Sequence, residues 1–296
     1  MTNLIKSKIS MLSAIIALSI LLISLLSWFL KFELYSTRAP VSAFIILLTL
    51  LLSGSIFMEQ AKNGKNFPVR KIRAFEAIEE AVARSVEMGR PVHATFGFGS
   101  MSSTMGPMYV AGLGVLKHAA NVCAKYGAKL IVTHGVPEAT AITEELVRES
   151  YYSGGRPELY DSINVRYLTD VQFAYASAVQ ATLVRENVGA NIVVGPFWAE
   201  TRIFMVTGDR IGAMQVAGTA REVQIPFFVL LADYAFIGEE IYAAGALASG
   251  DAVTLASLRG QDVGKLISIV LIIIGTILLM GGINMRAALD WVWRFG

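Results

Sequence analysis

The sequence predicts an α/β protein of 296 residues, with a Rossmann-like, mostly parallel sheet flanked by helices and three transmembrane helices. Two observations predict this class. In the middle of the chain, apolar strand-like runs alternate with helical periods, which is the rhythm of βα units. Around that region lie three stretches without an internal charge, and each has the roughly 20 residues needed to cross a hydrocarbon core about 30 Å thick. These stretches are Ile9 to Leu30, Ala39 to Met58 and Leu266 to Met285.

Two alternatives compete with membrane spanning. A buried helix of a soluble protein normally carries a polar stripe, and none of the three stretches has one. A cleaved signal peptide is the alternative for the first stretch, because Lys6 and Lys8 precede it. That stretch is long for a signal core and lacks a small-x-small cleavage pattern before Lys31, so we expect it to remain as an anchor.

The charge distribution predicts the topology. Basic residues resist translocation, and an N-terminus inside the cell leaves nine Lys and Arg near the segment ends in the cytoplasm and four outside. The expected organisation is then a transmembrane hairpin over residues 1–60 (spans 9–30 and 39–58), a basic juxtamembrane segment over 61–73, a cytoplasmic α/β domain over 74–262, and a C-terminal region over 263–296. The last region holds the third span (266–285) and an aromatic tail on the far side.

The overall charge of +2 hides a separation between the domain and its flanks. Residues 74–262 hold 13 Lys and Arg against 20 Asp and Glu, which is a net charge of −7. An acidic domain gives no support for nucleic-acid binding. The basic residues instead gather beside the second span, where we expect them to face anionic lipid. These membrane-surface residues are Lys62, Lys65, Arg70, Lys71 and Arg73.

The element pattern begins with an amphipathic helix over Ile72 to Glu87, which Gly89 and Pro91 end. Apolar runs then predict six strands, and periods of 3.6 residues predict the helices between them. The strands are Val92 to Phe96, Ala128 to Thr133, Asn164 to Thr169, Asn191 to Gly195, Ala213 to Ala217 and Phe227 to Ala232. The helices are Met108 to Tyr126, Glu138 to Tyr152, Val171 to Glu186, Trp198 to Thr207 and Ile237 to Ala248. The short connection from Gly218 to Gln224 is the place where this alternation could break.

Ligands of a doubly wound sheet bind at the carboxyl ends of its strands. The loop after the first predicted strand is rich in glycine and hydroxyl groups, and Pro107 predicts a helix start behind it. We expect this loop either to bind a small anion or to be a polar connection, because it lacks the P-loop lysine and has Ser102 where a dinucleotide fingerprint needs its third glycine. The candidate ligand residues in it are Gly97, Gly99, Ser100, Ser102, Ser103 and Thr104.

Four further residues are placed at the same edge by the predicted strands: His134, Asp170, Thr219 and Asp233. Each has a structural alternative, such as a hydrogen-bonded loop histidine or, for Asp170, the N-cap of the helix from Val171. The three histidines do not form a local metal motif, and Cys123 is the single cysteine, packed on a helical face. We expect no metal and no cofactor.

Several stretches of the chain resemble an uncharacterised group of prokaryotic membrane proteins that share a domain of unknown function. The stretches are Ala74 to Ala81, Glu87 to Val92, Leu168 to Tyr175, Gln215 to Ala220, Gln224 to Phe228, Ile237 to Ala244 and Ser257 to Asp262. The resemblance implies a membrane-tethered cytoplasmic domain and implies no activity or site residues.

Two functions are consistent with these features. The absence of a catalytic motif, and small residues at heptad spacing in the spans, favour an assembly or scaffold subunit that forms a homo-oligomer or a complex with other membrane subunits. Those small residues are Ser10, Ala17, Ser24, Ser268, Gly275 and Gly282. The hydroxyl-rich loop favours the alternative, a sensor or enzyme that binds a nucleotide-like anion. We expect assembly, in the cell membrane.

Overall fold

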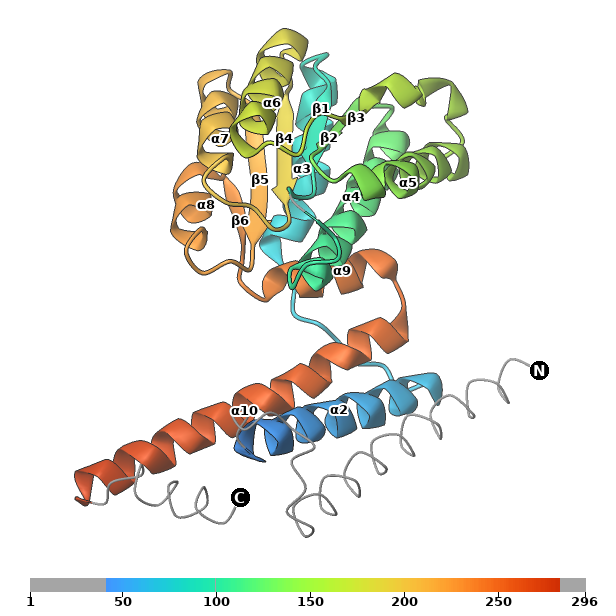
Figure 1. The fold of residues 1–296 in the computed structure, drawn as a ribbon. Helices are drawn as coiled ribbons and strands as arrows, with labels where there is room; N and C mark the ends of the chain where they lie inside the picture. Colours follow the sequence, from blue (N-terminus) through green and yellow to red (C-terminus); the bar gives the residue numbers. More distant parts are fainter. Residues whose placement is uncertain (1–40, 99, 283–296) are drawn as a thin grey trace. The chain divides into compact units, whose positions relative to one another are not determined.

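The computed structural model describes residues 41–98 and 100–282 of the chain. It divides the chain into two compact units, Val69–Gly250 and the combination of Met1–Pro68 with Asp251–Gly296. The first predicted span, 9–30, and the aromatic tail lie outside the described residues. Figure 1 shows the two described parts, an α/β unit and the helices α2 and α10.

The α/β unit is built on one six-stranded sheet in which every strand pair is parallel. The strand order is β3-β2-β1-β4-β5-β6, the order of a classical dinucleotide-binding fold. The Rossmann-like prediction is therefore confirmed. The strands are β1 (Val92–Thr95), β2 (Leu130–His134), β3 (Val165–Tyr167), β4 (Ala190–Val194), β5 (Met214–Thr219) and β6 (Tyr234–Ile237).

Helices cover both faces of this sheet (Figure 1). One layer consists of α3 (Arg73–Glu87), α4 (Gly106–Tyr126) and α5 (Thr140–Ser153), with α9 (Glu240–Ser249) against α4. The other layer consists of α6 (Gln172–Glu186), α7 (Thr201–Arg210) and α8 (Ile225–Leu231). Three short 3-10 helices, Pro137–Ala139, Pro157–Leu159 and Ser162–Asn164, lie on either side of α5 in the chain.

Each face of the sheet has its own hydrophobic core, because successive strand residues point to opposite faces. Val92, Ala94 and Phe96 pack with the α3–α4–α5 layer. The other core holds fully buried aromatic residues from the α6–α7–α8 layer, among them Tyr175 and Phe204. The sheet is thus buried on both sides, as parallel sheets are.

The sixth predicted strand is wrong. Of the predicted strand 227–232, residues 227–231 belong to α8 and Ala232 is its C-cap, and the strand β6 follows from Tyr234 to Ile237. A short apolar run does not distinguish a strand from a buried helix, and Pro226 in the first turn of α8 is the helix signal that decides it. The alternation of strands and helices therefore continues through the connection after β5.

The second unit contains two long helices, α2 (Val41–Lys62) and α10 (Ala252–Met280). Within the described residues, α10 alone is long and apolar enough to cross a membrane. The mean hydropathy of its most apolar 18 residues is 2.6. One such helix is thus found where the sequence predicts three. The second predicted span, 39–58, falls mostly in α2, which continues to Lys62.

The helices α2 and α10 touch through glycines. A Cβ on Gly260 would lie 2.5 Å from the Gly54 Cα, and the Ser53 hydroxyl donates a hydrogen bond to the Gly260 carbonyl oxygen at 3.2 Å. Of the predicted heptad positions, Ser10, Ala17 and Ser24 lie outside the described residues, Gly275 is buried, and Ser268 donates to the Gly264 carbonyl oxygen of its own helix. Small residues allow two membrane helices to approach closely, so the pattern recurs here at other positions.

We predict that Gly260→Leu separates α2 from α10, because the added side chain meets the backbone of Gly54 and backbone cannot move aside at small cost. The measurement is cross-linking of Leu50→Cys to Gly264→Cys by a short bis-maleimide in detergent. Cross-linking should fall severalfold with Gly260→Leu. It should persist with Gly281→Leu, since a Cβ on Gly281 meets no atom closer than 3.4 Å. Equal cross-linking in the two variants would contradict the contact.

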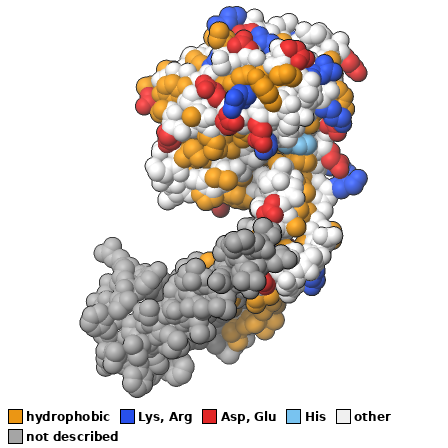
Figure 2. All heavy atoms as spheres, turned by 90° about the vertical axis from the view of Figure 1, so that its right-hand side faces the viewer, with side chains coloured by type: hydrophobic (Ala, Val, Ile, Leu, Met, Phe, Trp, Pro, Cys, Tyr) orange, Lys and Arg blue, Asp and Glu red, His pale blue; other side chains and the backbone are white. Residues whose placement is uncertain are grey.

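The predicted membrane-surface residues pair with different parts of the chain. Lys62 pairs with Glu59 at 3.6 Å, and Lys65 donates to the Gln60 side chain at 2.9 Å. Arg70 pairs with Glu240 and Lys71 lies 3.7 Å from Glu76, both carboxylates of the α/β unit, and Arg73 begins α3. On the face of the α/β unit in Figure 2, basic and acidic side chains are interspersed.

Candidate functional site at the carboxyl edge of the sheet

The strand order reverses between β1 and β4, which are neighbours in the sheet. From β1 the chain leaves to α4 on one face, and from β4 it leaves to α7 on the other face. In a doubly wound sheet, ligands bind in the crevice between two such departing loops. We call the space between the loops after β1 and β4 the switch-point crevice.

The two loops pack against each other at the base of this crevice. Gly97 has φ of +137°, and a Cβ there would lie 2.7 Å from the Tyr109 ring and 2.8 Å from Pro196. Gly195 has φ of +156°, and a Cβ there would overlap the Phe96 carbonyl oxygen. The two loops are therefore in backbone contact, with no room for even a methyl group between them.

Hydrogen bonds fasten the same contact. The Phe98 amide donates to the Pro196 carbonyl oxygen at 3.2 Å. The Tyr109 hydroxyl donates to the Phe98 carbonyl oxygen. Burial, together with the charges of Glu138 and Glu200, raises the pKa of Tyr109, so this hydroxyl remains a protonated donor.

The hydroxyl-rich loop after β1 binds a carboxylate of the same chain. The Ser100 hydroxyl and the Met101 amide both donate to Glu138 Oε1, at 2.9 and 3.0 Å, and the Ser102 hydroxyl lies 2.8 Å from that of Ser100. Hydrogen bonds from the Glu138 backbone amide and from Ser100 lower the pKa of Glu138, which keeps it ionised. Of the donors predicted for a small anion, Ser100 is thus already used by Glu138, and the Met101 amide binds the same oxygen.

The rest of the loop is solvent exposed or undescribed. Ser103 and Thr104 are exposed, and the Ser103 hydroxyl accepts a hydrogen bond from the Met105 amide at 3.2 Å. The helix α4 begins at Gly106 with Pro107 in its first turn, as the sequence predicts, but its N-cap makes no side-chain bond. Gly99 lies outside the described residues.

His134 is fully buried at the end of β2. Its Nδ1 lies 3.0 Å from the Val136 carbonyl oxygen, and its ring stacks on Phe96 with centroids 5.4 Å apart. Among the described residues its Nε2 has no hydrogen-bond partner. Burial lowers the pKa of His134 to about 4, so the ring is neutral, with the proton on Nδ1.

Thr219, at the end of β5, reaches the same edge of the sheet. Its hydroxyl lies 3.7 Å from the Met108 sulfur and accepts a hydrogen bond from the Arg221 amide at 3.2 Å. Asp170 is exposed before α6, and the N-cap role predicted for it is wrong. Val171 is the N-cap, and the Thr169 hydroxyl accepts the hydrogen bond from the Val171 amide.

Asp233 lies at the opposite edge of the sheet. It was placed after a sixth strand, but in the structure it precedes β6, and its carboxylate accepts a hydrogen bond from the amide of Gln215 near the start of β5, at 2.7 Å. Because the strand was assigned to the residues before Asp233 and not to those after it, Asp233 was predicted at the carboxyl edge of the sheet and lies at the amino edge. Asp233 therefore does not share an edge with Ser100, His134 and Thr219.

Buried polar side chains form a row through the middle of the sheet that the sequence analysis did not identify. The Thr133 hydroxyl lies 2.8 Å from His93 Nε2, and His93 Nδ1 lies 2.8 Å from Asn191 Oδ1. Asn191 Nδ2 donates to Gln215 Oε1 at 3.0 Å, and Gln215 Nε2 donates to the Leu231 carbonyl oxygen at 2.8 Å. The sequence carried a signal for it, since a polar residue stands second in each of β1, β4 and β5.

The tautomer of His93 follows from this row. The Asn191 oxygen needs a donor, so the proton lies on Nδ1, and Nε2 accepts from Thr133. Burial lowers the pKa of His93 to about 4. The row is thus neutral and fully hydrogen-bonded, and such an arrangement fixes strand register.

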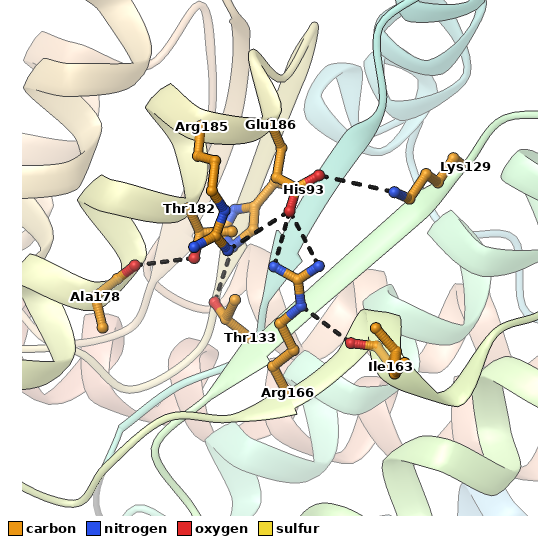
Figure 3. Close-up of polar contacts among 9 residues, drawn as sticks. All are labelled: His93, Lys129, Thr133, Ile163, Arg166, Ala178, Thr182, Arg185 and Glu186. Atoms are coloured by element: carbon orange, nitrogen blue, oxygen red, sulfur yellow. Dashed lines mark hydrogen bonds and ion pairs between the residues drawn. The ribbon is translucent and has the colours of Figure 1, made fainter.

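A second group missed by the sequence analysis lies beside the row. Figure 3 shows Glu186, at the end of α6, facing Arg166 of β3 together with Lys129 and Arg185. The two terminal guanidinium nitrogens of Arg166, Nη1 and Nη2, each lie 3.1 Å from Glu186 Oε1. The Lys129 ammonium and the Arg185 guanidinium lie 3.7 and 3.6 Å from the Glu186 carboxylate. Burial raises the pKa of Glu186, but the three cations outweigh it and the net shift is downward. This cluster fastens α6 to the edge of the sheet.

Glu200 is a third such group, a fully buried carboxylate after β4. It accepts hydrogen bonds from the Trp198 amide and from Gln172 Nε2, both at 2.7 Å.

Within the described residues, no group of three or more His, Cys, Asp and Glu side chains is arranged to hold a metal ion. Burial also raises the pKa of the Cys123 thiol, which makes it a poor nucleophile.

Residues 31–289 match the family described as a domain of unknown function (DUF6754). The chain belongs to this family. No curated protein matches the chain, and no solved structure does. The matched range runs from before α2 to beyond α10, so the family includes the helical unit as well as the α/β unit. The predicted resemblance is confirmed.

Proposed function

We propose that the protein is a membrane-anchored assembly subunit whose α/β unit lies in the cytoplasm and forms a homo-oligomeric or partner complex. One observation carries the proposal: at the base of the switch-point crevice, where this fold takes its ligands, Gly97 and Gly195 are packed against Tyr109, Pro196 and Phe96 with no space for a methyl group. A Rossmann-like unit without room at its usual site remains suited to protein contacts.

Membrane anchoring is supported by the surface of α10. Most large apolar side chains from Leu266 onward are exposed, from 44% at Val270 to 85% at Met280. Exposed apolar side chains on nearly all sides of a helix are suited to lipid and not to water. The proposed topology has three spans, 9–30, 39–58 and 266–285, with the N-terminus and the acidic α/β unit inside, because basic residues concentrate on that side.

The proposal is tested by the mass of the particle extracted from native membranes in mild detergent. We expect a discrete particle that contains more than one protein chain at micromolar concentration. A strictly monomeric particle would contradict the assembly function. Protease added to sealed right-side-out vesicles should leave the α/β unit intact, and its digestion would contradict the topology.

Binding of a small nucleotide-like anion is the alternative, and the buried, unpartnered Nε2 of His134 favours it. In this case the anion would replace Glu138 on Ser100 and Met101. A thermal-shift screen with ATP, NAD and phosphate distinguishes the two functions. A shift of several degrees that is lost with Ser102→Ala and Ser103→Ala and enlarged by Glu138→Gln supports binding, and no shift in any variant supports assembly.

A further inference from the structure

The helix α6 is a surface helix without charge along most of its length. Between Val171 and Val184 no residue is charged. Phe173 and Val184 are 59% and 56% exposed, and Ala174, Ser177 and Ala181 are also exposed. The spacing of Phe173, Ser177, Ala181 and Val184 places them on one helical face, which we call the α6 face. The outer face of a surface helix is normally charged or polar, so the α6 face is suited to a protein contact.

The neighbouring helices add apolar side chains, and two arginines, beside the α6 face. An open groove of about 370 Å³ lies between α6 and α7, and its lining includes the apolar side chains of Phe173, Ile203 and Val206. Two arginines, Arg202 and Arg210, also line it, and none of its lining residues is acidic. On α8, which is also free of charge, Val229 and Leu230 are 49% and 78% exposed. The opposite layer differs, because α3 and α5 together carry seven Glu and three Arg. The face in Figure 2 likewise carries interspersed charges.

The charges of the unit indicate what covers the α6 face. Residues 69–250, the α/β unit, hold 15 Lys and Arg against 18 Asp and Glu, a net charge of −3. Two copies of an acidic unit repel each other unless they meet through neutral surfaces. The α6 face is neutral, but its ends differ in sign: Asp170 is exposed before the first turn, and Arg185 is 66% exposed in the last turn. Antiparallel pairing of two α6 helices places the acidic end of each beside the basic end of the other. Parallel pairing places like charges together.

We propose that the α6 face packs against the α6 face of a second copy of this chain, antiparallel about a two-fold axis. A two-fold contact is isologous and is the commonest way in which identical chains associate. In this pairing Ser177 lies opposite Ala181 of the second copy, and Phe173 packs near its Val184. The small side chains at the centre allow the two helices to approach to about 8 Å. The inference rests on the proposed assembly function and names the surface and the partner.

Cysteine cross-linking in native membranes tests the pairing. Chains with Ser177→Cys and chains with Ala181→Cys, carrying different tags, are co-expressed and oxidised. The native thiol, Cys123, is fully buried and does not interfere. We expect the mixed disulfide dimer to form in at least about fivefold excess over either homodimer. Ala141→Cys, at an exposed position on α5, is the matched control and should not cross-link.

A charge placed on the α6 face is the second test. Ala181→Glu should lower the fraction of dimer, measured by chemical cross-linking of the full chain, by about tenfold, whereas Ala141→Glu should leave it unchanged. A multimeric particle without the mixed disulfide, or with equal cross-linking from Ala141→Cys, overturns this inference and leaves the assembly function standing. A monomeric particle overturns both. Cross-linking of Ala181→Cys to a different protein overturns the choice of partner.

Discussion

Replacing Gly195 by alanine is expected to destabilise the α/β unit by more than about 3 kcal/mol, a large part of the stability of an ordinary domain. Two causes act together. A φ of +156° is a conformation that only glycine adopts readily, and the new Cβ would overlap the Phe96 carbonyl oxygen at the junction of β1 and β4. The measurement is the urea midpoint of the detergent-solubilised protein, followed by resistance to protease.

Gly155→Ala is the matched control. Gly155 also has a positive φ, +72°, but a Cβ there meets no atom within 4 Å. Gly155→Ala should therefore lower the free energy of unfolding only through the strain of a left-handed backbone conformation, by about 1 kcal/mol. Similar midpoints for the two variants would show that the loops after β1 and β4 are not in backbone contact, and the main support for the proposed assembly function would be lost.

Five of the six strands were predictable from sequence because each is a short apolar run bounded by turn residues and followed by a helical period. Strand order was not predictable, since hydrogen bonding between β1 and β4 joins residues about 100 positions apart. The sixth strand was misassigned because the run beginning at Phe227 is apolar throughout and has no alternation. The strand β6 begins two residues after that run, at Tyr234, and within it Phe236 is buried and Ile237 is half exposed.

The position of the candidate site was predictable from sequence, but the contacts that other parts of the chain make with it were not. Strand ends and glycines point to the loop from Gly97 to Thr104 from local sequence alone. The carboxylate that binds Ser100 and the Met101 amide belongs to Glu138, which is 38 residues from Ser100 in the chain. The sequence around Glu138 does not reveal this partner, because a glutamate in the first turn of a helix is typically solvated or interacts with its own helix. The closure at Gly97 and Gly195 likewise depends on two loops that only the folded sheet brings together.

Acidification should destabilise the α/β unit well above the pH at which carboxylates titrate. His93 and His134 have pKa values of about 4 in the folded chain, against an ordinary value of 6.5. Below pH 6.5 the unfolded chain binds protons that the folded chain does not, so stability is fully present above pH 6.5 and is lost as the pH falls toward 4. Between pH 6.5 and 4.5 the loss should be about 2 kcal/mol for each histidine.

The pH profile of the urea midpoint, from pH 7.5 to 4.5, measures this loss, and two variants assign it. His134→Phe keeps an aromatic ring beside Phe96 and removes one titrating group, so the loss should fall from about 4 to about 2 kcal/mol. His93→Gln should halve the loss in the same way, whatever its effect on stability at pH 7.5. A profile that is unchanged in both variants would show that the two rings are accessible to protons in the folded state. The neutral polar row through the sheet would then be wrong.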